Sequence, residues 1–529
     1  MVMRSVYRGS LALFFPFFLI GLYIESNPNH LRPASDTLTA GRPVVRMSPR
    51  WPGCYAKSRS QTLSFVHVSD VHAHYNPDAS GSSPLARLKG FYERTRRENP
   101  FTLLTNAGDD YEKGSIAEAL SRGRTTRQLV QAMGYDVRTL GNHDFAWGLE
   151  ELLAFSRDPT AIVLATNTRM LDDKSAAKPG WTDYAALEVG CVRIGFFGLV
   201  SRPWNERDEA YDGAYFPELR SDFRHLETAR EIIARHRQEV DLLVLVSHLG
   251  LDEDIRLAEH TDGIDLILGG HSHSVEPRPV EVKDTLILHV GANLEHIGRL
   301  DIDFDVRGRR IRSRAFDLVP NLEEHAPPDP VIAAAVTRVL APYREELTAE
   351  VARIHTHQSK DSMARIAARA AVETLGLDAA LVGAHTVWTN WQPGTLTQQA
   401  VLDAYRVERE PVGEPGFSSL YRIEVTGAGL RRAWEALADF AYWGPLDIDP
   451  DARYTLAIQK PQAFHQSEFF GWEIGNRPPE PATELWEAVV AYGRARARAG
   501  LALDAEPSED RVQDLLALSP PGTARTPIR

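Results

Sequence analysis

Residues 63–74 read Leu63-Ser-Phe-Val-His-Val-Ser-Asp70-Val-His72-Ala-His74. The first half is apolar and partly β-branched, which predicts a buried strand. Because residues two apart in an extended chain point to the same side, Asp70 and His72 leave the strand end together. A carboxylate and an imidazole that converge suit a divalent metal ion. Asp-x-His alone also fits an ordinary polar turn, so the interpretation depends on the other strand ends.

Four more predicted strands end in the same residue types. The strand at 101–105 is followed by Asn106-Ala-Gly108-Asp109-Asp110, and the strand at 137–140 by Gly141-Asn142-His143-Asp144. The strand at 242–246 is followed by Ser247-His248, and the strand at 264–268 by Gly269-Gly270-His271-Ser-His273. Ligands of open α/β sheets bind outside the carboxyl ends of the strands, so these side chains are expected to converge. They exceed the needs of one ion and predict a two-metal centre with one bridging carboxylate.

Composition and charge restrict the classes of function. With 529 residues and 43% hydrophobic content, the chain is globular and long enough for two or three domains. The net charge is −13, and Lys and Arg are scattered along the chain. A nucleic acid polymer is therefore not an expected partner, and no protein partner is predicted. A small anionic substrate must be attracted by a local field, such as that of bound metal.

Strand and helix signals divide the chain into two folded regions. From 61 to 320, short apolar strands alternate with amphipathic helices, which predicts an α/β domain with a layered sheet. Helices are expected at 85–97, 116–133 and 229–238, and further strands at 162–165, 192–199 and 285–290. A connector at 321–355 contains a helix over 331–354, interrupted at Pro342, and leads to a second domain at 356–504. The tail at 505–529 is predicted to be disordered.

The N-terminal residues indicate export. Arg4 and Arg8 precede an apolar run of 14 residues at 11–24, the pattern of a secretory signal within 1–26, followed by a linker at 27–60. No small-x-small cleavage site follows, so an uncleaved N-terminal membrane anchor is the alternative. The expected location is periplasmic or otherwise extracytoplasmic. Cys54 and Cys191 are the only cysteines; two unpaired thiols are expected, with one disulfide as the alternative.

The ordered series Asp-x-His, Gly-Asp, Gly-Asn-His-Asp, single His and Gly-His-x-His resembles the calcineurin-like metallophosphoesterase superfamily. The runs Phe65 to His74, Ser247-His-Leu-Gly250 and Gly263 to His271 resemble its 5′-nucleotidase branch. In the second domain, Gly394-Thr-Leu-Thr and Ile423-Glu-Val-Thr-Gly427-Ala-Gly-Leu430 resemble the branch more thinly. The resemblance covers about 60–500. It implies a layered αββα metallophosphoesterase domain followed by a smaller α+β C-terminal domain that presents the substrate.

The resemblance also implies a role for each strand-end residue. One metal would be held by Asp70, His72, Asp109 and His273, and the other by Asp109, Asn142, His248 and His271. His143 would stay off the metals and protonate or polarise the leaving oxygen. Two divalent ions in such a site activate a water and neutralise the phosphoryl oxygens. Mixed imidazole and carboxylate ligands favour Mn²⁺, Zn²⁺ or Fe over Ca²⁺.

The catalytic histidine departs from the branch in its partner. In 5′-nucleotidases an Asp three residues after that histidine orients its ring, and Ala146 stands at this position here. Glu112 follows Asp109 by three residues, where other branches of the superfamily place the orienting acid. We therefore expect either that Glu112 replaces the missing partner of His143 or that Glu112 is a solvated loop residue.

The substrate pocket departs further. Val382-Gly-Ala-His385-Thr-Val-Trp388 stands where the branch carries Asn-Gly-Gly-Ile-Arg, and Lys460-Pro-Gln-Ala-Phe464 replaces a Gly-Asp-Gly loop. Trp388 and Phe464 are the candidates for stacking on a base. Core packing is the alternative for these residues and for three other aromatic candidates, which are Trp391, Phe469 and Phe470.

The sequence thus predicts an exported, two-metal phosphoesterase acting on a small phosphorylated substrate, first a nucleotide or related phosphomonoester. A phosphodiesterase is the second interpretation. A catalytically weakened metal- or anion-binding surface protein is an alternative from another class, and an enzyme for a sulfur ester is a more distant one.

Overall fold

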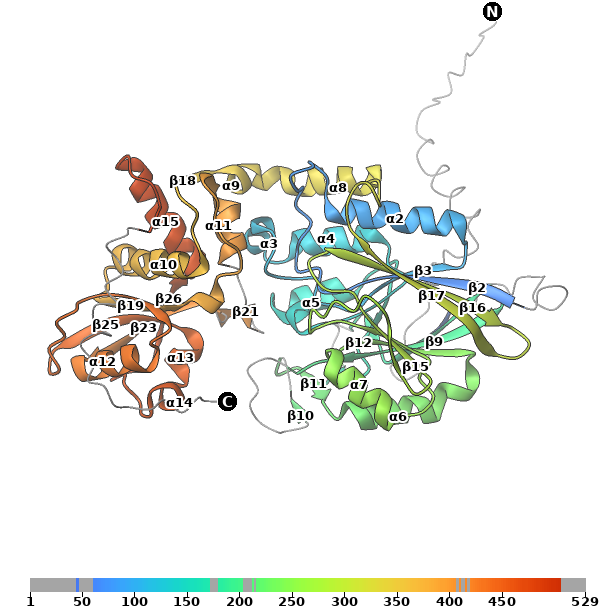
Figure 1. Ribbon diagram of the computed structural model, residues 1–529. Helices are drawn as coiled ribbons and strands as arrows, with labels where there is room; N and C mark the ends of the chain where they lie inside the picture. The colour runs from blue at the N-terminus through green and yellow to red at the C-terminus, as the bar shows by residue number, and fades with distance from the viewer. Residues whose placement is uncertain are drawn as a thin grey trace, which may run out of the picture.

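The computed structural model describes residues 44–46, 60–171, 179–202, 212–213, 216–405, 409–410, 414–415 and 419–505. The expected export segment at 1–26 and the tail at 506–529 lie outside the described residues. The chain forms a larger N-terminal domain and a smaller C-terminal domain side by side (Figure 1). Among the helices of the described part of the chain, none has the length and apolar character that crossing a membrane requires.

Two seven-stranded sheets form the N-terminal domain, and the five strand ends of interest belong to their central parallel strands. The first sheet has the order β17 (Arg310–Pro320), β16 (His296–Asp305), β2 (Ser60–Val68), β3 (Thr102–Asn106), β4 (Val137–Thr139), β5 (Ile162–Leu164), β7 (Trp181–Thr182). The second has the order β1 (Val44–Arg46), β8 (Tyr184–Val189), β9 (Val192–Val200), β12 (Leu242–His248), β13 (Leu266–Gly269), β15 (Thr285–His289), β14 (Val280–Val282).

The sheets pack face to face, and helices cover their outer faces. Phe65 and Leu103 of the first sheet share one buried core with Phe196 and Val244 of the second. The first sheet is covered by α2 (Pro84–Glu98), α4 (Arg124–Met133), α5 (Leu149–Ser156) and α8 (Pro330–Leu340), and the second by α6 (His225–His236) and α7 (Leu251–His260). The predicted αββα layering is therefore confirmed.

Two predicted helices differ in the structure: one is divided in two, and the other ends earlier than expected. The helix over 116–133 is divided into α3 (Ile116–Ser121) and α4, because Gly123 adopts the left-handed φ of 85°. A Cβ there would lie 2.7 Å from the indole of Trp147, so the site also requires glycine. The helix over 331–354 stops after α9 (Arg344–Thr348). The following β18 (Glu350–Ile354), in which Val351, Ala352 and Ile354 are buried, pairs with β20 (Gly394–Thr397).

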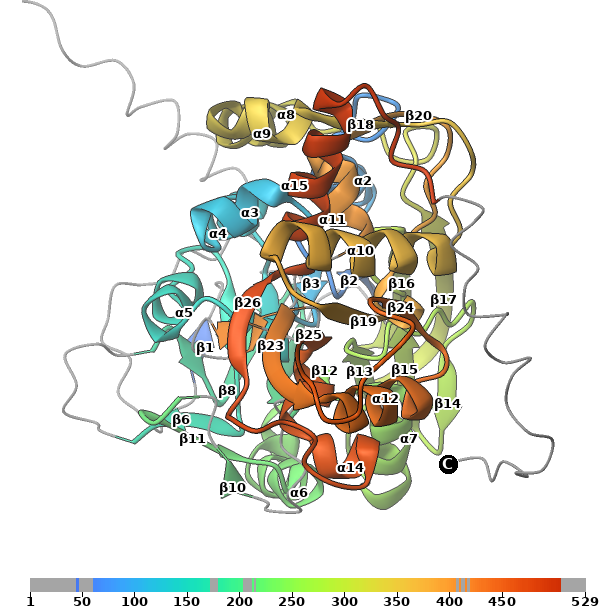
Figure 2. The same ribbon diagram turned by 90° about the vertical axis from the view of Figure 1, so that its left-hand side faces the viewer.

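The C-terminal domain is one five-stranded sheet between helices (Figure 2). Its order is β24 (Phe440–Trp443), β19 (Ala379–Gly383), β25 (Arg453–Gln459), β23 (Ser419–Thr426), β26 (Glu480–Glu484). One face packs on α10 (Lys360–Leu375) and α15 (Leu485–Arg498), with α11 (Gln398–Ala404) in the same core. The other packs on α12 (Gly427–Ala436), α13 (Lys460–Phe464) and α14 (Gln466–Phe470). The N-terminal domain also contains a separate three-stranded sheet with the order β10 (Asp212–Gly213), β11 (Leu219–Asp222), β6 (Thr168–Met170).

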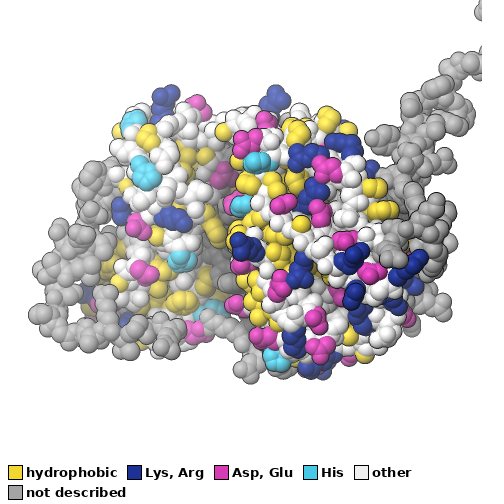
Figure 3. All heavy atoms as spheres, turned by 45° about the vertical axis from the view of Figure 1, so that its right-hand side comes forward, with side chains coloured by type: hydrophobic (Ala, Val, Ile, Leu, Met, Phe, Trp, Pro, Cys, Tyr) yellow, Lys and Arg dark blue, Asp and Glu magenta, His cyan; other side chains and the backbone are white. Residues whose placement is uncertain are grey.

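The two domains meet at the loop that follows β3. Gln399 on α11 accepts a hydrogen bond from the Ile116 amide (2.9 Å) and donates one to the Gly114 carbonyl (2.7 Å). Ile116 is fully buried in the apolar core of the C-terminal domain. Figure 3 shows a hollow between the two lobes, and charges of both signs are interspersed on that face. The C-terminal domain thus holds the loop that carries Glu112 by two hydrogen bonds and by burial of Ile116.

Cys191 is disulfide-bonded, so the expectation of two unpaired thiols is wrong. The residue lies in the tight turn between β8 and β9, and its amide donates to the Gln61 side chain (2.7 Å). A disulfide was the alternative expectation, and Cys191 lies in the turn rather than within either strand.

Candidate metal centre

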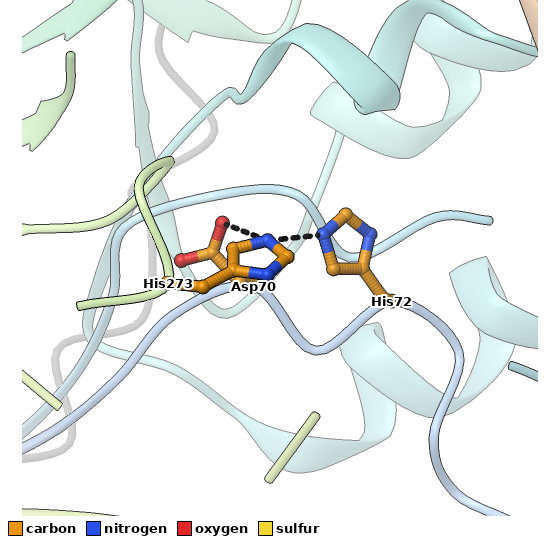
Figure 4. A group of neighbouring side chains, drawn as sticks. All are labelled: Asp70, His72 and His273. Carbon is orange, nitrogen blue, oxygen red and sulfur yellow. Dashed lines mark hydrogen bonds and ion pairs between the residues drawn. The ribbon is translucent and has the colours of Figure 1, made fainter. Parts of the chain in front are cut away.

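Three residues from two loops form the first ligand cluster. Asp70 and His72 follow β2, and His273 follows β13, 201 residues away from His72 along the chain. His273 Nε2 lies 3.0 Å from His72 Nε2 and 3.5 Å from Asp70 Oδ1, so three ligand-type atoms face one point (Figure 4). The group has the residue types and spacing of a metal site.

Asp109, His248 and His271 form a second cluster of the same kind. His248 Nε2 lies 3.0 Å from Asp109 Oδ2, and His72 Nε2 of the first cluster lies 3.8 Å from the same oxygen. Asp109 therefore stands between the two clusters, where a bridging carboxylate has to be.

The backbone at the ligands is folded into the left-handed region. Positive φ angles between 46° and 77° occur at five of the predicted ligands: Asp70, His72, Asp109, His271 and His273. Such angles are uncommon for residues other than glycine and concentrate at functional sites. Gly141 permits the close approach of two of these loops, because a Cβ there would lie 2.1 Å from Asp109 Oδ1. Gly141 is required by its neighbour rather than by its own φ.

Backbone carbonyls fix the orientation of two imidazoles. His72 Nδ1 lies 3.0 Å from the Tyr111 carbonyl, and His248 Nδ1 lies 2.6 Å from the Ala107 carbonyl. Each ring therefore donates from Nδ1 and directs the lone pair of Nε2 into the site. The Nε2 atom of His248 is buried and faces the Asp109 carboxylate at 3.0 Å. Imidazole nitrogens and carboxylate oxygens that converge in this way are ligands of divalent ions, so the residues present fit a pair of them.

The imidazoles are held largely neutral, the form that binds metal. Burial, and then the charge of Lys113, lowers the pKa of His72 well below its ordinary value. Burial and the neighbouring His248 lower the pKa of His271 to about 3. His248 is the exception: burial opposes its charged form, but the carboxylate of Asp109 raises its pKa to about 9. Metal loading should therefore release a proton from this cluster.

The two carboxylates differ in their pKa values. Burial would raise the pKa of Asp109, but the charges of His248 and His143 hold it well below its ordinary value. Burial raises the pKa of Asp70 to about 6 despite the opposing charge of His248. Asp109 is thus the more strongly ionised carboxylate, which suits a ligand shared between two cations.

Asn142 and Asp144 lie in the short helix η1 (Asn142–Phe145) after β4. The side-chain oxygen of Asn142 accepts a hydrogen bond from Ser201 (3.2 Å). Asp144 was not predicted to have a role. Its carboxylate accepts hydrogen bonds from the amides of Gly141 (2.8 Å), Asp110 (2.9 Å) and Asp109 (3.2 Å). Asp144 therefore ties the loop after β4 to the loop after β3.

Glu112 and His143 form a close pair. His143 Nδ1 lies 2.5 Å from Glu112 Oε2, and Glu112 is almost fully buried. Ala146 is also buried and offers no carboxylate. Of the two expectations for Glu112, the solvated loop residue does not fit this geometry. Burial, and then the charge of Lys113, lowers the pKa of His143 well below its ordinary value.

Lys113 was missed by the sequence interpretation. The residue is almost buried, has a φ of 73°, and its charge acts on His72, His143 and His271. Its ammonium lies 5.8 Å from the centre of the Trp388 ring, across the domain boundary. The only signal in the sequence was its place directly after Glu112.

The aromatic candidates of the C-terminal domain are divided between surface and core. Trp388 is 39% exposed and Phe464 is 50% exposed, so both are available for contact. Trp391 and Phe470 are buried, at 4% and 0%, and pack in the two cores of the domain. Phe469 is partly buried against the second core.

Three further histidines lie in or beside the strands of this domain. His67 is buried within β2, between the hydroxyl of Thr105 (3.1 Å) and the Gly269 carbonyl (3.3 Å). His74 lies 3.3 Å from the Val71 carbonyl, and His296 begins β16. None of these three belongs to the two clusters found in the described part of the chain.

Residues 63–275 match the family model of the calcineurin-like phosphoesterases. This part of the chain is therefore a calcineurin-like phosphoesterase domain, as the motif series predicts. An apyrase of Tabanus yao is 28% identical over 285 residues, covering 48% of this chain and 50% of the relative. The 5′-nucleotidase of Bos taurus is 25% identical over 325 residues, covering 54% and 53%. The predicted relationship to the 5′-nucleotidase branch is confirmed, although the matches span about half of each relative.

Solved structures share the two-domain fold. A 5′-nucleotidase precursor from Thermus thermophilus has a TM-score of 0.65 at 19% identity, covering 82% of this chain and 96% of its own. The sulfate thiohydrolase SoxB from Thermus thermophilus has a TM-score of 0.60 at 18% identity, covering 82% and 94%. At these identities the likeness concerns the fold alone.

Proposed function

We propose that this chain is an exported, two-metal phosphoesterase that hydrolyses a nucleotide or a related phosphomonoester. The observation that carries the proposal is the Glu112–His143 pair at 2.5 Å beside two ligand clusters that share Asp109. Asp70, His72, Asp109 and His273 would hold one ion, and Asp109, Asn142, His248 and His271 the other. Two divalent ions there would activate a water and neutralise the phosphoryl oxygens. Mn²⁺, Zn²⁺ and Fe suit this donor set.

His143 would supply the proton that the leaving oxygen needs. Glu112 accepts from Nδ1, so Nε2 is the nitrogen directed at a substrate. The low pKa of the free ring means that the acid form must be stabilised by the bound phosphate. A neighbouring anion raises the pKa of an imidazole, so substrate binding itself would load the proton. Asp144 and the strained loops would hold both partners in place.

Export is part of the proposal. The basic and apolar N-terminal pattern supports it, and so does the disulfide at Cys191, because such bonds persist mainly in oxidising compartments. Fractionation of cells that express the tagged full chain tests this step. Recovery in the cytoplasmic fraction with both cysteines reactive toward a thiol reagent would contradict it.

The activity is tested with apo protein supplied with Mn²⁺, Zn²⁺, Co²⁺ or Mg²⁺ and a panel of phosphomonoesters and phosphodiesters. We expect hydrolysis of monoesters, nucleoside monophosphates among them. A preference for diesters would favour the phosphodiesterase interpretation. No hydrolysis of any ester with metal restored would favour the binding protein.

The role of Glu112 is tested by the leaving group. Glu112→Gln should lower kcat for an alkyl phosphate by about 10²-fold, the lower range of general acid catalysis, and much less for nitrophenyl phosphate. Ala146→Asp, which restores the branch's usual acid, should then add little. Strong activation by Ala146→Asp together with a silent Glu112→Gln would show that His143 works unassisted.

A further inference from the structure

A buried carboxylate outside the metal centre contacts both loops that carry the Glu112–His143 pair. Glu118 lies in the first turn of α3 and is 1% exposed. Its Oε1 accepts hydrogen bonds from the Glu112 amide (2.6 Å) and from Nε1 of Trp147 (2.8 Å). Its Oε2 accepts a hydrogen bond from the Thr126 hydroxyl. The side chain of Glu118 thus contacts the backbone of Glu112, the indole of Trp147 and, through Thr126, helix α4.

The contact to the Glu112 amide matters because of the local backbone. Glu112 and Lys113 both have left-handed φ angles, 70° and 73°. Such a conformation is costly for residues with side chains and persists only where the surroundings hold it. An oxygen that accepts from the Glu112 amide satisfies a buried backbone donor in this conformation, and an unsatisfied donor there would be costly. Glu118 therefore contacts the backbone of the residue whose side chain contacts His143.

Trp147 connects the same carboxylate to the histidine loop. It lies four residues after His143, and its indole also packs over Gly123, where a Cβ would meet it at 2.7 Å. Through Oε1 of Glu118, the loop after β3 and the loop after β4 share one acceptor. Glu118 is thus linked directly to the backbone of Glu112 and, through Trp147, to the loop of His143.

We propose that Glu118 is a positioning residue for the catalytic pair: it sets the geometry between Glu112 and His143 without touching substrate or metal. The inference rests on the proposed function, since it concerns the proton given to the leaving group. It requires only hydrogen-bond acceptors at the amide and the indole, not the charge of Glu118. Burial raises the pKa of Glu118 to about 7, in agreement with a group whose charge is not its main contribution.

The hydrogen-bond pattern offers a conservative variant. In Glu118→Gln, the amide oxygen can accept from both N–H groups, and the amide nitrogen can donate to Thr126. The Thr126 hydroxyl can then donate to the Tyr75 hydroxyl, which lies 3.2 Å away. Glu118→Gln should therefore retain activity, whereas Glu118→Ala removes all three acceptor contacts.

The experiment compares kcat for an alkyl phosphate and for nitrophenyl phosphate in the metal-loaded full chain. Glu118→Ala should lower kcat for the alkyl phosphate by about 10²-fold, the cost of displacing a catalytic group by about 1 Å. The effect on nitrophenyl phosphate should be small, the metal content by elemental analysis unchanged, and Glu118→Gln close to wild type. In the Glu112→Gln background, Glu118→Ala should add little, because both act on one interaction.

Asp136→Ala is the matched control. Asp136 is a partly buried carboxylate that also accepts from a backbone amide, that of Leu104 (2.8 Å), but at the amino end of β4, away from the ligands. Its loss should lower stability without any dependence on the leaving group. If Glu118→Ala does not fold, Trp147→Phe removes one of the two donors to Oε1 and should reproduce the leaving-group effect in part.

Four results would overturn the inference. An equal loss with both leaving groups would mean a merely structural role. A Glu118→Gln variant as impaired as Glu118→Ala would mean that the charge itself acts. Wild type that hydrolyses no ester would remove the proposed function and this inference with it, whereas active wild type with a silent Glu118→Ala removes the inference alone.

Discussion

The N-terminal and C-terminal domains differ in how their functional residues are placed. In the first, the ligand-type residues follow strands that run parallel toward one edge, and Asp70, Asp109 and His248 arrive together although they are far apart in sequence. In the second, Trp388 is exposed while Trp391, three residues on, is buried in the core. Strand ends converge by geometry, whereas an aromatic residue is placed by the packing around it. The comparison predicts that variants of the first domain change metal binding and turnover and that variants of the second change substrate choice.

The largest effect is expected at Asp109, where the comparison is sharpest. Asp109→Ala should lose both ions and all activity, because this carboxylate lies within 3.8 Å of imidazoles from both clusters. Elemental analysis of purified wild type and variant measures the stoichiometry. One metal per chain in active wild type would contradict a shared carboxylate.

His143 separates catalysis from metal binding within the same domain. His143→Ala should keep both metals and lose turnover by about 10²–10⁴-fold, the usual contribution of a general acid. Elemental analysis and kcat on one preparation measure the two quantities together. Loss of metal would mean that His143 is a ligand, and unchanged turnover would remove it from the mechanism.

Substitution of Gln399 tests whether the two domains have separate roles, because Gln399 belongs to the second domain but is hydrogen-bonded to the loop that carries Glu112. Gln399→Ala removes hydrogen bonds to Gly114 and Ile116 and so loosens the loop that carries Glu112. The kcat for an alkyl phosphate, which has no base to contact, should fall by about tenfold, less than the loss expected for a full misplacement of the catalytic group. Gln131→Ala, which removes a side-chain bond to the Ala154 carbonyl within the first domain, is the control and should leave kcat unchanged. If kcat is unaffected in Gln399→Ala as well, the second domain acts on substrate choice alone.

The smallest effect is expected at Trp388. If its ring contacts the base, Trp388→Ala should raise KM for a nucleotide by about five- to tenfold, the range of a lost aromatic contact. The KM for nitrophenyl phosphate should stay unchanged. Trp472→Ala is the control, since this residue is also exposed (51%) but packs beside Arg432. Equal effects of both substitutions would mean that neither ring is specific to the pocket.

Much of the site could be predicted from the sequence because its logic is local. Asp70 and His72 are two residues apart at the end of an apolar run. Parallel strands then bring the other strand-end residues to the same edge of the sheet. Glu112 could be named as one of two alternatives from its spacing to Asp109, but its choice required the 2.5 Å contact to His143. At each of these positions the sequence indicates a strand end and a residue type, and those two facts are enough to name a candidate ligand.

The remaining features depend on contacts between distant residues. Gln399 reaches Gly114 from 285 residues away, and no pattern near either residue announces the pair. Glu118 looks like an ordinary helix residue, since glutamate is common in a first turn, and only its burial reveals it. The break at Gly123 was hidden because residues 116–133 have helical periodicity on both sides of it.

The hydrogen bonds between Gln399 and the loop after β3 also have a consequence for how the two domains evolve. A chimera that joins this phosphoesterase domain to the C-terminal domain of a relative would place a foreign helix against Gly114 and Ile116. Unless that helix carries an amide at the position of Gln399 and a pocket for Ile116, the transplanted domain would leave an apolar side chain and two backbone groups without partners. The pair of domains is thus expected to diverge as one unit, with α11 and the 112–118 loop changing in step.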